Sequence, residues 1–209
     1  MSKIVLCMWM SLDGFIAGPE DGPGQGLGIG GERLHDFVTF DGPDHPAAAH
    51  SDDEVGAAVM AELMTSGAVL TGRRTYDLAG GWGGDHHDGV PIIVLTRSPG
   101  PASGLVRPVA DVREAAARAR EAAGDKDVLL HGASAARAFL LAGEIDEMAL
   151  QIVPVLLGRG RRLFGDAPGE LPPEQVELEL VHSAVGPGMV HLRYRVLREG
   201  GAAVDSRDG

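Results

Sequence analysis

The sequence predicts an α/β fold in which a mostly parallel central sheet carries helices on both faces. Short, unbroken apolar runs alternate with helical patterns along most of the chain, as expected of strands that are buried on both sides. Near the C-terminus the pattern changes to strict alternation, in residues 175–181 and 189–197. This change indicates an antiparallel pair with one solvated face at the edge of the sheet.

The first strand is predicted at residues 4–10, IVLCMWM, and the polar, flexible segment SLDGFIAG follows it. Ligands of open α/β sheets bind beyond the carboxyl ends of the strands, so Asp13 is a candidate site residue. An ordinary Asp-Gly turn is an equally good interpretation of Asp13. Residues 19–31 contain a G-x-G-x-x-G match, but a Pro-containing loop precedes it instead of a strand. We therefore interpret this segment as a mobile, lid-like loop.

Further elements are expected along the middle of the chain. A short helix is predicted at residues 32–40, followed by a loop at 41–50. Capping-type sequences at 51–54 and 111–114 predict the starts of two longer helices. Buried strands are expected at 68–70 and 90–95, and the turn at 71–76 opens another helix.

The segment KDVLLHGASAARAFLLAG, residues 126–143, predicts a strand, a tight turn of small residues and a helix. Ser134 is the predicted N-cap of this helix, Gly143 its C-terminal stop, and the next strand is expected at 148–157. Such a turn directs backbone N–H groups and the positive end of a helix dipole at one point. The small residues admit a phosphate or simply allow the helix to pack tightly on the sheet, and the sequence leaves both interpretations open.

Composition restricts the class of protein. A net charge of -12 over 209 residues argues against a nucleic-acid or anionic-membrane partner. Cys7 is the single cysteine, which fits a reducing compartment, and the first residues lead directly into a strand. We therefore expect a cytoplasmic protein with one domain at residues 1–198 and a disordered tail at 199–209.

Three predicted strand ends carry residues suited to phosphate: 71–76, 96–98 and 131–134. A pair of arginines at strand ends suits the extra phosphate that distinguishes NADP from NAD. A single arginine at a strand end is more often a solvated surface charge. The recurrence of arginines at successive strand ends favours phosphate binding. The arginines are Arg73, Arg74 and Arg97, and the accompanying hydroxyl groups belong to Thr75, Thr96 and Ser98.

Five segments in this order resemble a known family: SLDGFIAG, VLTGRRTYD, PIIVLTRSP, the glycine turn before AARAFLLAGEIDEM, and IVPVLLGRGRRLF. The chain resembles dihydrofolate reductase-like proteins over about residues 3–197, nearly its whole length. Within that group it is most similar to the reductase domain of the bifunctional riboflavin-biosynthesis deaminase–reductase and its stand-alone relatives. The zinc-binding signature of the deaminase half is absent from the sequence.

The resemblance implies a three-layer dihydrofolate reductase-like fold, an NADPH-dependent reductase and a homodimer. It implies that Asp13 lies near the point of hydride transfer and that Ile16 and Ala17 lie beside the nicotinamide. The adenosine 2′-phosphate side would contact Gly72, Arg73, Arg74, Thr75, Leu95, Thr96 and Arg97. The pyrophosphate would contact Gly132, Ala133 and Ser134, where Ala133 replaces the second glycine usual in the family. Glu32 and Asp36 lie after the lid, but the accompanying folate-site pattern is missing, so folate is not the expected substrate.

The expected reaction is hydride transfer from NADPH to an electrophilic carbon of a small heterocyclic or phosphoribosylamino-pyrimidine-like substrate. Asp13 would orient the substrate or the water that delivers the proton. The basic cluster that follows the later strand would bind a substrate phosphate, or would form a surface or subunit contact. This cluster consists of Arg159, Arg161 and Arg162.

A non-catalytic nucleotide-binding protein is one alternative. A serine hydrolase using Ser134 is another, with Asp146 or Asp166 and His182 or His191 as partners. Asp85-His86-His87-Asp88 invites a metal site, but we expect an exposed polar loop and no metal, with Trp82 capping the core or contacting the cofactor.

Overall fold

The computed structural model describes residues 2–40, 49–51, 53–165, 169 and 171–198. The strands of its main sheet are, in chain order, β1 (Ile4–Ser11), β5 (Ala68–Gly72), β6 (Ile92–Leu95), β7 (Val106–Val109), β8 (Val128–His131), β9 (Glu147–Val153), β11 (Leu178–Val185) and β12 (Val190–Val196). The helices are α1 (Glu54–Leu63), α2 (Arg73–Leu78), α3 (Val112–Ala123) and α4 (Ala133–Leu141). Smaller elements are the strands β2 (Phe15–Ala17), β3 (Thr39–Phe40), β4 (Ala49–His50) and β10 (Arg161–Arg162), and the 3-10 segments η1 (Gly31–His35) and η3 (Gly80–Gly84).

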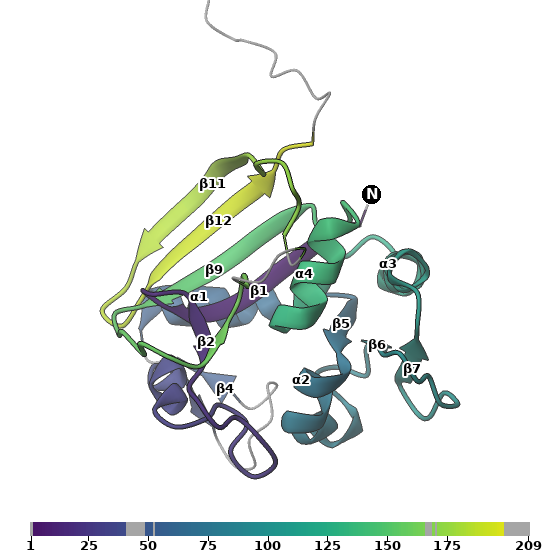
Figure 1. Cartoon of the computed structure of the whole chain (residues 1–209), viewed down its shortest axis with the longest axis horizontal. Helices are drawn as coiled ribbons and strands as arrows, with labels where there is room; N and C mark the ends of the chain where they lie inside the picture. The colour runs from purple at the N-terminus through teal and green to yellow at the C-terminus, as the bar shows by residue number, and fades with distance from the viewer. Residues whose placement is uncertain (1, 41–48, 52, 166–168, 170, 199–209) are drawn as a thin grey trace, which may run out of the picture.

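The main sheet has the order β11-β12-β9-β1-β8-β5-β6-β7 (Figure 1). The pairs from β9 to β7 are parallel, whereas β12 is antiparallel to β9 and to the edge strand β11. The small strands form two separate antiparallel pairs, β2 with β10 and β3 with β4. The predicted fold class, a mostly parallel sheet with an antiparallel C-terminal edge pair, is confirmed.

Helices cover both faces of the sheet, which explains the unbroken apolar strands. On one face α3 and α4 pack their alanines and Phe139 against Leu6, Leu70 and Leu130. On the other face α1 and Trp82 pack against the alternate residues of the same strands, such as Val69 and Leu129. Each large side chain buried in this way contributes roughly 1.5–3 kcal/mol, so both faces of a strand have to be apolar.

The two predicted helix starts are confirmed by their caps. The Asp53 carboxylate accepts a hydrogen bond from the Gly56 N–H at 2.9 Å, and the Asp111 carboxylate accepts one from the Glu114 N–H at 2.8 Å. Each acid satisfies a backbone donor that has no partner within its own helix, and it lies at the positive end of the helix dipole.

Several boundaries differ from the prediction. Residues 32–40 form the short η1 turn and strand β3 instead of a helix, because Leu34 is the only fully buried side chain that the turn provides. The edge strand β11 begins at Leu178 and shifts register between Leu180 and His182, so both of its faces stay exposed. Strand β7 was not predicted, because its sequence VRPV has neither an apolar run nor clear alternation. The predicted tail at 199–209, and residues 41–48 of the predicted loop 41–50, lie outside the described residues.

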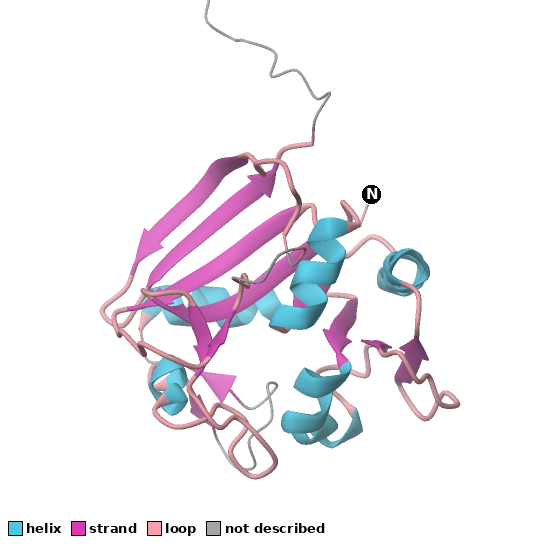
Figure 2. Cartoon of the chain, in the orientation of Figure 1, coloured by secondary structure: helices cyan, strands magenta, loops and turns pink. Residues whose placement is uncertain are grey.

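The glycine-rich segment between β2 and η1 folds back on itself. The Gly18 N–H donates to the Leu27 carbonyl at 2.8 Å, and the Ile29 N–H donates to the Pro19 carbonyl at 2.8 Å. A side chain at Gly18 would lie 2.0 Å from the Ile29 carbonyl oxygen, so only glycine permits this approach of the two backbones. In Figure 2 this loop lies beside helix α2 at one end of the sheet. Among the described residues, no helix has the length and apolar character needed to span a membrane.

Candidate functional site

The predicted phosphate-binding turns lie side by side at the carboxyl edge of the sheet. In the parallel register Thr71 is paired with His131 and Gly72 with Leu95. The segments that follow these residues therefore leave the sheet at the same level. This is the arrangement in which ligands of open α/β sheets bind.

A cleft of about 680 Å³ opens at this edge, between the glycine-rich loop, helix α2 and the ends of β1 and β8. Its volume lies within the usual range for small-molecule and cofactor sites. Six of the residues predicted from the sequence line it: Ile16, Ala17, Arg74, Thr75, Gly132 and Arg161. The other predicted site residues are not among its lining residues.

The turn after β8 is held close to α2. Gly132 has a φ of +92°, and a Cβ atom there would lie 2.2 Å from the Thr75 hydroxyl oxygen. Gly132 is itself the N-cap of α4, so the predicted cap at Ser134 is wrong: the helix begins at Ala133, and Ser134 is exposed on its first turn. The Gly132 N–H donates to the Met8 sulfur at 3.2 Å, which ties the turn to β1.

The remaining predicted cofactor residues are not among those that line the cleft. Arg73 pairs with Asp77 at 2.9 Å and lines a second hollow of about 350 Å³, together with Tyr76 and Val94. At the end of β6, Leu95 and Thr96 are half-buried, whereas Arg97 is exposed. Of the predicted cofactor residues outside the cleft, only Arg73 is among the residues that line this neighbouring hollow.

The basic cluster predicted to bind substrate is also divided. Arg159 is exposed, and Arg161 lines the cleft. The Arg162 guanidinium lies over the Phe15 ring at 4.4 Å and donates to the Asp13 carbonyl at 3.0 Å. Of the three arginines, only Arg161 is in a position to meet a ligand inside the cleft.

Asp13 fastens two loops together. Its carboxylate accepts hydrogen bonds from the Leu157 N–H at 3.1 Å, the Gly158 N–H at 2.7 Å and the Ser11 hydroxyl at 2.6 Å. Desolvation raises the pKa of this carboxyl group, but the hydrogen bonds from Ser11, Gly158 and Leu157 outweigh it and hold the pKa below its usual value. Asp13 is not among the residues that line the cleft, so its predicted catalytic role stays a prediction.

The substitution Asp13→Asn tests the two roles of Asp13. Because the amide replaces one acceptor oxygen by a donor, one loop N–H loses its partner, and we expect unfolding to become easier by about 1–3 kcal/mol. Urea denaturation measures this loss. A catalytic Asp13 requires in addition a fall of at least about tenfold in kcat for the folded variant. A variant with the parent stability would contradict the fastening role.

Sequence reasoning offered Trp82 as a cap of the core or a cofactor contact, but it missed the aromatic wall that Trp82 forms with two histidines. Trp82, His131 and the buried His86 lie against one another, with ring centres 4.8 Å apart for Trp82–His86 and 5.4 Å apart for His86–His131. Trp82 and His131 line the cleft, and Trp82 has a φ of +49°, a strained value for a residue with a side chain. The clustering of Trp82 with two histidines in a glycine-rich segment was the available signal.

The expectation of an exposed loop at residues 85–88 is wrong for its two histidines. His86 and His87 are 2% and 1% exposed. Their Nδ1 atoms are 2.7 Å apart, and the His87 Nε2 lies 3.1 Å from the Ser66 carbonyl oxygen, to which it donates. These contacts neutralise the cost of burying two polar rings and place the loop behind the cleft wall. Among the described residues, no three potential metal ligands gather at one place.

The opposite end of the cleft is formed by Trp9, His35 and Glu32. The Trp9 and His35 rings meet edge to face at 5.5 Å, and Trp9 also stacks on Phe37 at 6.0 Å. Both tryptophans of the chain, Trp9 and Trp82, therefore line the same cleft.

Two histidines of the cleft predict a pH dependence of stability. Burial lowers the pKa of His35 and of His131 to about 4, although the hydrogen bond between the His131 Nδ1 and the Cys7 carbonyl oxygen acts in the opposite direction. Both rings bind a proton more readily in the unfolded chain, where the pKa is near 6.5. Stability is therefore complete above about pH 6.5 and is lost as the pH falls towards 4.

We expect the free energy of unfolding to fall by about 2–4 kcal/mol between about pH 7 and pH 4.5, since each ring keeps part of its surface in solvent. Urea denaturation at several pH values measures the slope. Replacing His131 by glutamine should reduce the slope. Equal slopes for the His131 variant and the parent would contradict this prediction.

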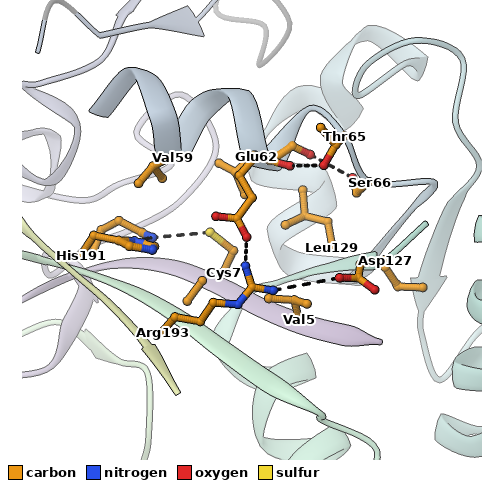
Figure 3. Close-up of a pocket in the computed structure, with 14 residues that line it drawn as sticks. Val5, Cys7, Val59, Glu62, Thr65, Ser66, Asp127, Leu129, His191 and Arg193 are labelled. Carbon is orange, nitrogen blue, oxygen red and sulfur yellow. Dashed lines mark hydrogen bonds and ion pairs between the residues drawn. The ribbon is translucent and has the colours of Figure 1, made fainter. Parts of the chain in front are cut away.

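A third, smaller cavity of about 70 Å³ lies between α1 and the sheet (Figure 3). Arg193 reaches across it, pairing with Glu62 and with Glu147, the latter at 2.6 Å. Cys7 lies at its floor, and burial raises the pKa of this thiol to about 12, so the thiolate that would react is suppressed. The charged side chains in this cavity pair with one another. No residue that lines this cavity also lines the cleft.

The hydrolase interpretation finds no support in the positions of its proposed partners. His191 is buried and lies 2.9 Å from the Gln151 amide nitrogen, and Asp146 pairs with Arg120 and Arg198. Asp166 lies outside the described residues. Because of these contacts, neither His191 nor Asp146 is available to Ser134.

Comparison with solved structures defines the class of fold. A protein from Shewanella sp. PV-4 assigned to riboflavin biosynthesis superposes with a TM-score of 0.68 at 23% identity, covering 95% of this chain and 100% of that one. A pyrimidine reductase-like protein from Corynebacterium diphtheriae gives 0.59 at 16% identity, with 95% and 93% covered. The chain thus shares the fold of these two proteins, and the predicted dihydrofolate reductase-like fold is confirmed.

A third structure is the diaminohydroxyphosphoribosylaminopyrimidine deaminase/5-amino-6-(5-phosphoribosylamino)uracil reductase of Thermotoga maritima. It matches with a TM-score of 0.57 at 15% identity over 94% of this chain, which spans 57% of that protein. Residues 94–192 match the family model of the RibD C-terminal domain, so the resemblance to that reductase-like family is confirmed. A search of the curated proteins found no match.

Proposed function

We propose that the protein is an NADPH-dependent reductase that transfers hydride to a small heterocyclic or phosphoribosylamino-pyrimidine-like substrate. One observation carries the proposal: residues from three separate segments converge on a single cleft at the carboxyl edge of the sheet. These segments supply an apolar wall at Ile16 and Ala17, a guanidinium at Arg74, a hydroxyl at Thr75 and a close backbone turn at Gly132. Apolar, cationic and hydroxyl groups around one cleft suit a phosphorylated dinucleotide.

The cleft residues fit this cofactor. The lack of a side chain at Gly132 lets the Thr75 hydroxyl approach the turn, where this hydroxyl and the backbone would contact the pyrophosphate, and Arg74 in the same cleft would bind a further phosphate. Gly72, Ala133 and Ser134 flank this turn, and Arg73, Leu95, Thr96 and Arg97 would bind the adenosine 2′-phosphate side beyond α2. NADPH would supply the hydride when bound. The protein's residues would orient the two reactants and exclude water.

The substrate would lie at the opposite end, between Trp9, His35 and Glu32. Aromatic faces suit a planar heterocycle, and Arg161 would contact a substrate phosphate. Asp13 would act from the adjoining loop by keeping it in place or, as the resemblance implies, by orienting the proton-donating water.

The test is to follow the oxidation of NADPH and NADH spectroscopically with a panel of phosphorylated and unphosphorylated aminopyrimidines, pterins and carbonyl compounds. We expect turnover with NADPH and one heterocycle, and a clear preference for NADPH over NADH. Tight NADPH binding without oxidation across the panel would instead identify a non-catalytic nucleotide-binding protein.

We propose further that the protein works as a homodimer in the reducing cytoplasm. On the edge strand β11, Leu180 is 55% exposed and Val185 is 77% exposed. Such apolar exposure is unusual for a strand whose outer edge has no partner strand. The buried thiol of Cys7 needs no oxidising compartment. Light scattering after size-exclusion chromatography measures the mass in solution, and a monomer at micromolar concentration would contradict the dimer.

A further inference from the structure

Two arginines of the cleft converge on one carboxylate, that of Asp21 in the glycine-rich loop. Arg161 donates to both carboxylate oxygens, from Nε at 2.9 Å and from the terminal nitrogen at 3.1 Å. Arg74 donates from Nε to the carboxylate at 3.1 Å and from a terminal nitrogen to the Asp21 carbonyl at 2.6 Å. Arg74 and Arg161 were expected to bind different phosphates, but the structure brings them to a single anion.

The contacts of the Asp21 carboxylate are those expected of a bound anion. Its side chain is only 12% exposed, and the hydrogen bonds and charges of the two arginines, Arg161 first, lower its pKa. Charge-assisted hydrogen bonds from two guanidinium groups are the usual means by which proteins bind carboxylate and phosphate. The pair of arginines with one aspartate retains a single positive charge, in a chain whose net charge is -12.

The loop is built so that Asp21 can leave without unfolding it. The hydrogen bonds between Gly18 and Leu27 and between Pro19 and Ile29 close the base of the loop. Gly22 and Gln25 exchange two further hydrogen bonds at its tip, at 3.1 and 3.0 Å. None of these bonds involves the Asp21 side chain, so the carboxylate can separate from the arginines while the frame of the loop persists.

We propose that Arg74 and Arg161 form one binding site for a phosphate monoester, and that Asp21 occupies this site as an internal competitor until the ligand displaces it. A phosphate monoester carries more charge than a carboxylate and offers three acceptor oxygens, so it matches the four converging donors better. The proposal deepens the proposed function, because it gives a single ligand phosphate to both arginines. The alternative is that Asp21 only anchors the loop.

Charge-neutral variants of adjacent residues separate the two readings. Asp21→Asn removes the internal competitor, and Glu20→Gln, an exposed neighbour on the same loop, is the matched control with the same change in charge. Adenosine 2′,5′-bisphosphate represents the cofactor phosphate, and ribose 5-phosphate represents a substrate phosphate. Isothermal titration of each protein with each probe needs no turnover, so it remains informative if the reductase activity is not found.

We expect Asp21→Asn to bind one of the two probes at least about tenfold more tightly than the parent and Glu20→Gln, because the fraction of open sites rises. The responding probe identifies the source of the phosphate. Adding Arg161→Gln to the Asp21 variant should abolish the gain. A gain no larger than that of Glu20→Gln for both probes would overturn the proposal and leave Asp21 as an anchor.

A second measurement covers the case in which the Asp21 variant does not fold. Arg74→Gln and Arg161→Gln, each introduced alone into the parent, should weaken binding of the same probe by similar factors. If each substitution weakens a different probe, the arginines serve separate phosphates and the single site is refuted.

Discussion

Replacing Gly132 by alanine is expected to weaken nucleotide binding by about a hundredfold or more and to destabilise the fold by about 2–4 kcal/mol. Two physical effects add at this position. The φ of +92° is one that side chains rarely adopt, and the new Cβ would lie 2.2 Å from the Thr75 hydroxyl oxygen and 3.1 Å from the Thr75 Cβ. Relief requires the turn and α2 to separate, which displaces the groups proposed to hold the phosphates.

Gly143 provides the control at the other end of the same helix. Its φ is +69°, but nothing lies within 4 Å of a Cβ atom built there. Gly143→Ala should therefore cost about 1 kcal/mol of backbone strain and leave nucleotide binding unchanged. Calorimetric titration and thermal unfolding of both variants make the comparison. Parent-like NADPH affinity in a folded Gly132→Ala variant would contradict the assigned role of the turn.

Replacing Arg193 by methionine is expected to destabilise the protein by about 3–5 kcal/mol without changing the cleft. Glu147 is 3% exposed and lies 2.6 Å from the Arg193 Nε, so the substitution leaves this buried carboxylate with only the Lys3 ammonium, at 2.7 Å. Methionine retains most of the apolar volume, and the loss therefore reports the charge. Figure 3 shows Arg193 extending between Glu62 and Asp127 below α1.

The neighbouring Arg195 provides a matched control on the same strand. It pairs with Glu179, and both side chains are 51% exposed. Solvent screens such a pair, so Arg195→Met should cost less than about 1 kcal/mol. Chemical denaturation of the two variants tests the difference. Equal losses of unfolding free energy in the two variants would show that burial does not strengthen the ion pair between Arg193 and Glu147.

The sequence was sufficient for the layers of the fold because strands buried on both faces have a distinctive composition. Residues 4–10, 68–70 and 128–130 are continuous apolar runs, and each became a central strand. Strand β7 escaped prediction because its partner β6 determines it, while Arg107 and Pro108 weaken the local pattern. At Ser134 the local capping preference lost to Gly132, whose positive φ starts the helix two residues earlier than a cap at Ser134 would.

The candidate site was predictable where a strand end carries its own chemical signal. Gly132, Thr75 and Arg74 could be found in this way, since each follows directly from a buried strand. Partners from distant loops could not: Asp21 contacts Arg161 across 140 positions, and no local pattern identifies such a pair. The buried His86 and His87 were misjudged because a glycine-rich setting suggests solvent, whereas contacts with the distant residues Ser66 and His131, and with the nearby Trp82, bury them.

Fluorescence titration with NADPH and with NADH tests most directly whether this cleft binds a phosphorylated nicotinamide dinucleotide. Because Trp9 and Trp82 both line the cleft, their emission should be transferred to a bound reduced nicotinamide, and the quenching should saturate at lower NADPH than NADH concentrations. Replacing either tryptophan by phenylalanine should remove part of the signal. Absence of saturable quenching by both nucleotides, confirmed by calorimetry, would contradict the reductase assignment.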